Sequence, residues 1–303
     1  MGREYITEFV ERRVPIPAEN MDTDETNYVV MKNELILGKG SNAGKEMSGL
    51  TITANKLLRL LIMQCLKTDF EFKPYKITTT ELSEFLSIDK SNLSRARIVQ
   101  DLTLTLMKEV VLVGDGNPNH NWKAYHWVET AEYKDGVYTF QLSRDMKQFL
   151  LNLGRNYTQY EIGEILSFKS VYALRLFELI TMTLGLQRKK DKIYNENTAT
   201  IELSDETVRL ATGTTSRYLK TNDFKKNVMD IAAREINART FGWKMSYEYI
   251  KEGRRVIGYR ITLRDSLYGM HVKAGKWKDQ EMIEDDRITG QMNIFDYELK
   301  ENI

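Results

Sequence analysis

The stretch Ser204–Leu263 constrains the fold more than any other part of this 303-residue chain. Ser204 is a favourable helix N-cap, and the next two residues are acidic, which suits the positive end of the helix dipole. Gly213 offers a turn at the end of this short helix, and Thr221 or Asn222 can cap a second one. Apolar residues at helical spacing then predict a longer helix that faces a core: Phe224, Val228, Ile231, Ala232 and Ile236.

A β-hairpin is predicted directly after these helices. Two segments with alternating polar and apolar residues, Trp243–Ile250 and Val256–Leu263, are joined by the basic link Lys251–Arg255. Helix, turn, helix and hairpin is the order of elements in a winged helix-turn-helix, a module that binds DNA.

The charge of this region supports a DNA-binding surface. The window Arg217–Arg264 contains twelve Lys or Arg and five Asp or Glu, a net charge of +7, whereas the whole chain carries only +1. Phosphate binding needs a local concentration of cations, because each neutralised phosphate releases counterions at that place. A solvated surface would have a similar composition, so the order of elements is what favours DNA binding.

The first half of the chain predicts the same order of elements. A strong helix over Ala54–Lys67 carries an apolar face that includes the single cysteine, Cys65. The later elements are a strand at Tyr75–Thr78, a helix over Glu81–Leu86 capped by Thr80, a turn at Asp89–Ser91, a helix that Asn92 caps and that runs to about Met107, and strands at Val110–Val113, Trp122–Glu132 and Val137–Leu142. The second copy begins at Ser143, with helices over Arg144–Leu153, Thr158–Leu166 and from about Lys169 to Leu184, and a strand over Thr198–Leu203.

Three motifs in the second half resemble a known family, the plasmid replication initiators built from two winged helices. They are Phe224-Lys225-Lys226-Asn227-Val228, Ala232-Ala233-Arg234-Glu235-Ile236-Asn237 and Lys251-Glu252-Gly253-Arg254. The run Lys169–Leu179 also resembles the family, and for it we favour core packing, with a Tyr, an Arg and a Glu at the edge, over contact with bases. The resemblance extends over roughly Tyr28 to Leu263.

The predicted fold is therefore α+β, with two tandem winged-helix domains and a disordered acidic C-terminal tail. The predicted limits are a flexible N-terminal arm over 1–27, winged-helix domains over 28–142 and 143–265, and the tail over 266–303. The resemblance implies an initiator that binds directly repeated double-stranded DNA sites at an origin, recruits host replication proteins and exchanges between monomer and dimer, the dimer repressing its own gene. A transcriptional regulator with two winged helices and no role in initiation is the alternative, and an interaction scaffold that does not touch DNA is a third interpretation.

Early residues of a recognition helix reach base edges, and Lys or Arg can pair with guanine. In the second module we expect base contacts from Lys225 and Lys226, with Arg217 and Lys220 in the preceding turn, while Lys251, Arg254 and Arg255 bind phosphate or enter the minor groove. Corresponding positions in the first module are Lys90, Ser91, Asn92, Arg95 and Arg97. For Arg95, near the apolar face, a packed stem with a local ion pair is an equally good interpretation.

Motifs for catalysis are missing, so we expect no enzymatic activity, no metal and no cofactor. His120, His126 and His271 form no His-hydrophobe-His nickase site, and Cys65 has no second cysteine to share a zinc ion or an intramolecular disulfide. The segment from Gly40 to Lys45 is one residue short of a P-loop and continues with Glu46 instead of Ser or Thr. The single cysteine and the lack of a long apolar run agree with a cytoplasmic protein that does not bind membranes.

The acidic tail contains a pentapeptide that resembles the bacterial sliding-clamp-binding motif. It consists of Gln291, Met292, Asn293, Ile294 and Phe295, within a segment, 281–303, of net charge −5. A Gln can anchor such a peptide by hydrogen bonds while the aliphatic and aromatic side chains fill an apolar pocket. The alternative is a tail that packs its own Ile and Phe onto the domain.

Overall fold

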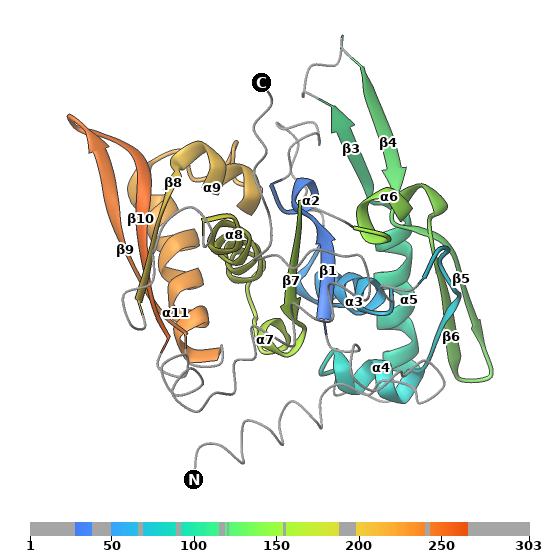
Figure 1. Cartoon of the computed structure of the whole chain (residues 1–303). Helices are drawn as coiled ribbons and strands as arrows, with labels where there is room; N and C mark the ends of the chain where they lie inside the picture. Colours follow the sequence, from blue (N-terminus) through green and yellow to red (C-terminus); the bar gives the residue numbers. More distant parts are fainter. Residues whose placement is uncertain are drawn as a thin grey trace, which may run out of the picture.

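Two winged helices lie on either side of a central two-stranded ribbon (Figure 1). This computed structural model describes residues 28–37, 50–65, 69–88, 92–114, 119, 121–153, 156–187, 198–239 and 243–265. The ribbon consists of β1 (Tyr28–Lys32) and β7 (Tyr157–Glu161), which pair antiparallel. The helix α2 (Asn33–Leu37) follows β1 and contacts α8 (Val171–Gln187). The ribbon thus joins the two halves, and it crosses the predicted domain boundary at Ser143.

The first winged helix has the expected elements in the expected order. Its sheet has the strand order β2-β6-β5, so the strand between the helices pairs with the last strand of the hairpin. The elements are α3 (Ile52–Met63), β2 (Tyr75–Thr78), α4 (Thr79–Phe85), α5 (Asn92–Lys108), β5 (Val128–Lys134) and β6 (Val137–Leu142). A second hairpin, β3 (Val110–Gly114) and β4 (Trp122–His126), is inserted after α5 and projects from the domain (Figure 1). The short helices η2 (Arg144–Met146), α6 (Lys147–Leu150) and α7 (Gly163–Leu166) connect this domain to α8.

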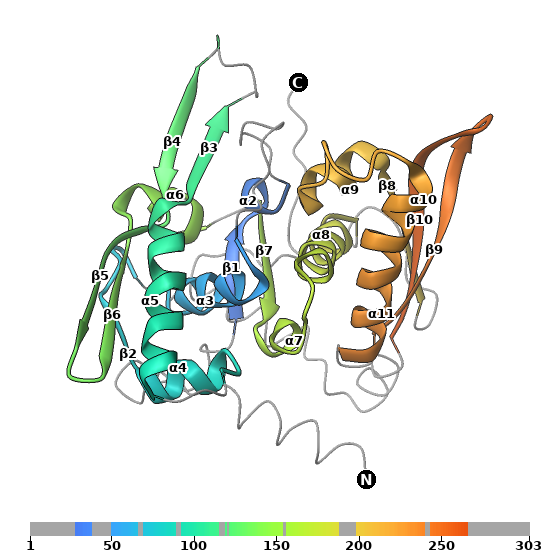
Figure 2. The same cartoon turned by 180° about the vertical axis from the view of Figure 1, so that it is seen from behind.

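The second winged helix repeats this topology. Its sheet order β8-β10-β9 corresponds to β2-β6-β5 in the first domain. The elements after α8 are β8 (Thr198–Ser204), α9 (Asp205–Thr212), α10 (Thr221–Phe224), η3 (Lys225–Met229), α11 (Asp230–Arg239), β9 (Trp243–Glu252) and β10 (Arg255–Asp265). Figure 2 shows α11 lying across one face of this sheet. The repeated order of elements that the sequence predicted is confirmed.

Along β10, buried and exposed side chains alternate, and this explains how the sheet packs against the helices. Tyr259, Ile261 and Leu263 are buried under the helices, whereas Arg260 and Arg264 are exposed on the other face. All three strands share this alternation, so a single apolar face holds the helices against the sheet.

Both ends of α9 follow the predicted capping, whereas the start of α4 differs from it. Ser204 caps α9 by accepting a hydrogen bond from the amide of Thr207, and Gly213 ends that helix in the left-handed conformation. In the first domain Thr78, and not Thr80, caps α4, because Glu81 reaches back to Thr78 and completes a capping box.

The predicted helix over Thr158–Leu166 is wrong in its first half. These residues form β7, and helix begins only at Gly163. The Thr158 hydroxyl is buried and donates to Oδ1 of Asn33 at 2.7 Å, a partner 125 positions away that no local pattern reveals. The helix predicted over Arg144–Leu153 is likewise shorter, since η2 and α6 end at Leu150.

The predicted strand Trp122–Glu132 is divided at Trp127. The first part pairs with β3 and the second with β6, and Trp127, at the break, is buried. The carbonyl of Trp127 accepts the amide of Ser143 at 3.0 Å, which fixes the break. The link predicted over Lys251–Arg255 is also tighter, because only Gly253 and Arg254 lie between the strands.

A buried ionic cluster connects α3 to α8. Both carboxylate oxygens of Glu178 on α8 accept hydrogen bonds from Arg59 on α3, at 2.9 and 3.0 Å. Glu178 also accepts from the Tyr160 hydroxyl at 2.5 Å and from Arg175 at 3.5 Å. Burial alone would raise the pKa of Glu178, but the two guanidinium charges and the hydrogen bonds lower it below its ordinary value. The run Lys169–Leu179 thus packs in the core as predicted, but Arg175 and Glu178 are buried and do not lie at its edge.

Candidate nucleic-acid interface

The helix of the second domain that corresponds to a recognition helix runs without interruption from Thr221 to Arg239 through α10, η3 and α11. Neither Thr221 nor Asn222 caps it: Lys220 occupies the N-cap position and makes no capping bond with its side chain. The buried face is formed by Phe224, Val228, Met229, Ala232 and Ile236. Lys226, Asn227 and Arg234 are exposed on the opposite face, and of these only Lys226 was among the predicted contacts.

The first half of this helix contains a single π-helical turn, Lys225–Met229. Such turns are rare and occur frequently at functional sites. The wider turn brings Nζ of Lys225 to within 2.7 Å of Asp230, five positions further along the chain. Hydrogen bonding to Asp230 raises the pKa of Lys225. Lys225, which we predicted to contact bases, is thus paired within the protein.

Asp230 connects the recognition helix to the hairpin. Besides the Lys225 ammonium, its carboxylate accepts a hydrogen bond from the Tyr247 hydroxyl on β9 at 2.6 Å. Partial burial would raise the pKa of Asp230, but these two hydrogen bonds and the nearby charge of Lys225 lower it. Asp230 therefore stays ionised, and it holds the helix and the wing in one arrangement.

In the second domain, four of the predicted DNA contacts are exposed and make neither an ion pair nor a ring contact within the described ranges: Lys220, Lys226, Arg254 and Arg255. Two of them lie at the start of the recognition helix and two at the tip of the hairpin. Lys251 is also exposed and lies 5.7 Å from the centre of the Tyr249 ring. Arg217 is exposed in the turn between the helices.

The opposite face of the sheet gives a contrast. There Arg260 pairs with Glu202 on the neighbouring strand, with Nη2 and Oε1 2.8 Å apart. This arginine is neutralised locally and faces away from the recognition helix. The net charge of the segment counts both faces together, so it does not show that, among the described residues, the cations without an ion pair are concentrated on the side of the recognition helix.

Arg209 fixes the turn that precedes the recognition helix. Its guanidinium pairs with Asp205 at 2.7 Å and donates to the carbonyls of Arg217 and Tyr218, both at 3.2 Å. It also lies over the ring of Phe224, with Cζ 4.1 Å from the ring centre. No role for Arg209 was predicted from the sequence.

Two residues of the motif Ala232–Asn237 form hydrogen bonds that hold other elements in place. Glu235 accepts the backbone amides of Lys169 and Ser170, at 2.8 and 3.0 Å, next to the start of α8. Asn237 exchanges two hydrogen bonds with the backbone of Met245 on β9, at 2.9 and 2.5 Å. These contacts fix the angle between the recognition helix, α8 and the hairpin.

The corresponding surface of the first domain is described only in part. Arg97 is exposed on the early part of α5, and Arg95 is partly buried. Asn92 is the first residue of α5 instead of its cap, and Lys90 and Ser91 lie outside the described residues. The same is true of Gln291, Met292, Ile294 and Phe295, of the N-terminal arm and of the whole acidic tail.

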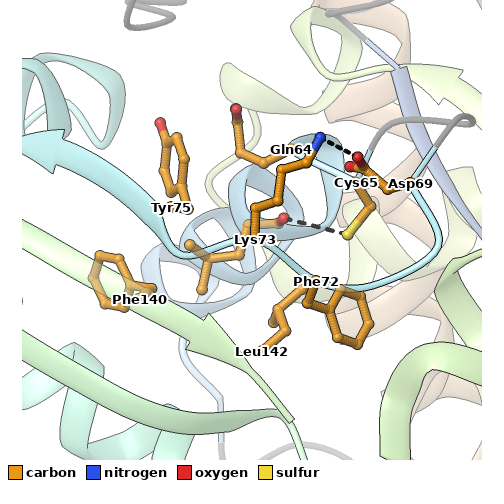
Figure 3. A pocket seen from close by; sticks show the side chains of 9 residues that line it. Gln64, Cys65, Asp69, Phe72, Lys73, Tyr75, Phe140 and Leu142 are labelled. Atoms are coloured by element: carbon orange, nitrogen blue, oxygen red, sulfur yellow. Dashed lines mark hydrogen bonds and ion pairs between the residues drawn. The ribbon is translucent and has the colours of Figure 1, made fainter. Parts of the chain in front are cut away.

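A small pocket in the first domain is a poor fit for a cofactor. It lies between α3, β2 and β6, and its lining includes Cys65, Phe72 and Tyr75 (Figure 3). Its volume of about 20 Å³ is that of a single water molecule. Among the described residues, no three His, Cys, Asp or Glu side chains are grouped to hold a metal ion. No helix within these ranges has the length and hydrophobicity needed to cross a bilayer.

Comparison with known proteins identifies both halves of the chain. Residues 28–181 match the family model described as "Initiator Replication protein, WH1", and residues 206–263 match "Initiator Rep protein, WH2". The fold is also similar to the crystal structure of the Pi initiator protein in complex with iteron DNA, with a TM-score of 0.60 at 15% sequence identity over 80% of this chain and 99% of that one. The first match extends beyond Ser143 and includes both strands of the ribbon. The chain belongs to the family of initiator replication proteins with two winged-helix domains.

Proposed function

We propose that this chain initiates plasmid replication by binding directly repeated duplex sites with both of its winged helices. The observation that carries the proposal is the match of both halves to the initiator family, together with the exposed cations of the second domain. The Pi initiator protein, which has a similar fold, was crystallised with iteron DNA. Two modules on one chain double the phosphate contacts and lengthen the recognised sequence.

Within this proposal the cations have different roles. Lys226, on the exposed face of the recognition helix, reads base edges in the major groove. Arg254 and Arg255, at the tip of the hairpin, bind phosphates. Lys225 supports them from within the protein, through its pairing with Asp230.

The roles can be separated by measuring affinity for a repeat duplex and for a scrambled duplex over a series of salt concentrations. Lys226→Ala should weaken binding to the repeat by about 1–3 kcal/mol and should leave the scrambled duplex nearly unaffected. Arg254→Ala should weaken both and lower the salt slope by about 1. Arg260→Ala removes the same charge from the opposite face and should change neither. Equal effects of the first two variants on every sequence would contradict the assignment.

Family membership also supports two kinds of protein partner. The first is a second copy of the chain, in a monomer–dimer exchange that lets the dimer repress its own gene. The second is the host replication machinery, with the sliding clamp bound by the segment from Gln291 to Phe295. Full-length chain should bind purified bacterial clamp, and Gln291→Ala with Phe295→Ala should abolish this; affinity that survives both changes would exclude the motif.

In this proposal the protein acts in the cytoplasm, binds DNA and catalyses no reaction. Purified chain incubated with origin DNA and ATP should produce no nicked, joined or hydrolysed product, and any such product would contradict this part. A plasmid that carries the gene and its adjacent repeats should replicate. If the chain binds the repeats but the plasmid does not replicate, the protein is a transcriptional regulator and not an initiator.

A further inference from the structure

Among the described residues of the second domain, Leu219 is the most exposed large apolar side chain. It is 74% exposed, whereas most large apolar side chains of the domain are buried. It directly precedes Lys220, the N-cap residue of the recognition helix, and follows Arg217 by two positions. The flanking residues Lys220, Thr221 and Asn222 are exposed and polar. A leucine in this place stands out against its surroundings.

An apolar residue just before a helix N-cap usually packs on the fourth residue of that helix, in a hydrophobic staple. Here the fourth residue is Phe224, which is fully buried. The guanidinium of Arg209 lies over that ring, with 4.1 Å between Cζ and the ring centre. A long cation therefore covers the surface on which Leu219 would otherwise pack.

The backbone of the turn directs Leu219 outward and holds it there. Tyr218 has φ of +50°, an unfavourable conformation for a bulky residue. Its ring packs edge-on against Tyr172 of α8, with ring centres 6.2 Å apart, and its carbonyl accepts a hydrogen bond from Arg209. Strained backbone that surrounding contacts hold in place is concentrated at functional sites. Tyr218 is thus turned inward, and the next side chain is presented to the solvent.

The position of this exposed leucine indicates what it contacts. In the major groove the 5-methyl group of thymine is the apolar feature by which bases are distinguished, and apolar side chains read it. We propose that Leu219 contacts a thymine methyl group and so selects thymine at one position of each bound site. This inference rests on the proposed function, since it places the start of the recognition helix in the major groove.

The experiment replaces each thymidine of the site, one at a time, by deoxyuridine, which lacks the methyl group and pairs identically. The probe is the duplex that the full chain selects from a randomised pool. Affinities are measured by fluorescence anisotropy for the unsubstituted chain, Leu219→Ala and Leu219→Met. Phe70→Ala, which removes a side chain that is also 74% exposed but lies in the first domain, is the control.

Replacing thymine by uracil at one or two positions should lower the affinity of the unsubstituted chain for the duplex about three- to fivefold, which is what one buried methyl group contributes. The Leu219→Ala variant should bind the thymine duplex with a similar loss of affinity and should lose no further affinity when uracil replaces thymine. The Leu219→Met variant should still bind the thymine duplex more tightly than the uracil duplex. The Phe70→Ala variant should behave as the unsubstituted chain. Equal loss by Leu219→Ala on both duplexes, or no thymine that depends on Leu219, would overturn the inference while DNA binding stands. Failure of the unsubstituted chain to select any duplex would overturn the proposed function with it.

Discussion

Replacing Glu178 by Gln should destabilise the chain more than any surface change. Glu178 is completely buried, and its two oxygens accept four hydrogen bonds, from Arg59, Tyr160 and Arg175. Gln supplies only one acceptor, and its amide would point N–H donors at a guanidinium that is itself only 2% exposed. The change therefore leaves buried positive charge without its carboxylate.

Removing one partner of a buried ion pair costs about 3–5 kcal/mol. This is a large part of the 5–15 kcal/mol that is typical of folded domains. Because about 1 kcal/mol lowers Tm by roughly 2–4 °C in chains of this size range, Tm should fall by about 6–20 °C.

The assay is thermal and urea unfolding of the full chain, followed by circular dichroism. Glu202→Gln is the matched control, since it makes the same chemical change in the exposed pair with Arg260 and should cost less than about 1 kcal/mol. A loss for Glu178→Gln as small as that of the control would refute the reasoning. Such a result would mean that water or a rearranged Glu109, which lies close enough to Arg175 to have its own pKa affected, compensates the charge.

Three more expectations concern pH, packing and DNA affinity. Because the pKa of Glu178 is lowered in the folded chain, its contribution to folding stability is complete above about pH 4.3 and is lost as the pH falls through the pKa of the folded state. Between pH 7 and pH 3, the Glu178→Gln variant should therefore lose less stability than the unsubstituted chain in unfolding measurements. Gly258→Ala should cost about 1–3 kcal/mol in urea unfolding, because the new Cβ would meet the Leu203 carbonyl oxygen at 2.5 Å, and an unchanged midpoint would contradict this. Asp230→Asn removes an anion and releases Lys225, so it should tighten binding to random duplex and steepen the salt slope by about 1, whereas weaker binding would show that the Asp230 contacts matter more than its charge.

The second winged helix could be predicted largely from its sequence, because its signals are local. Ser204 and Gly213 mark the ends of one helix, and helical spacing from Phe224 to Ile236 marks the core face of the next. The π turn within that helix was not predictable, since it depends on where the wing places Tyr247 and on the pairing of Lys225 with Asp230.

Elements whose partners are distant in the sequence were the ones misjudged. The sequence predicts a helix from Thr158, but these residues form a strand that is defined by its pairing with Tyr28–Lys32. In the same way, the alternating pattern across Trp127 does not reveal that its two sides pair with different strands.

At the candidate interface, composition identified the basic surface but could not divide it into paired and exposed cations. Lys225 and Lys226 are adjacent and identical in type, yet one pairs with Asp230 and the other is exposed. Arg209 was overlooked because its importance depends on two carbonyl groups and a ring that only the folded turn brings together.

The most direct test of the central claim is a hydroxyl-radical footprint of the full chain on a duplex that carries one direct repeat of about two helical turns. Two winged helices on one chain predict two protected patches on one face of the duplex, about one helical turn apart. Lys226→Ala should weaken protection in one patch, and Arg97→Ala should weaken it in the other. A single patch, or protection that is the same on a scrambled duplex, would contradict the claim that both domains read the repeat.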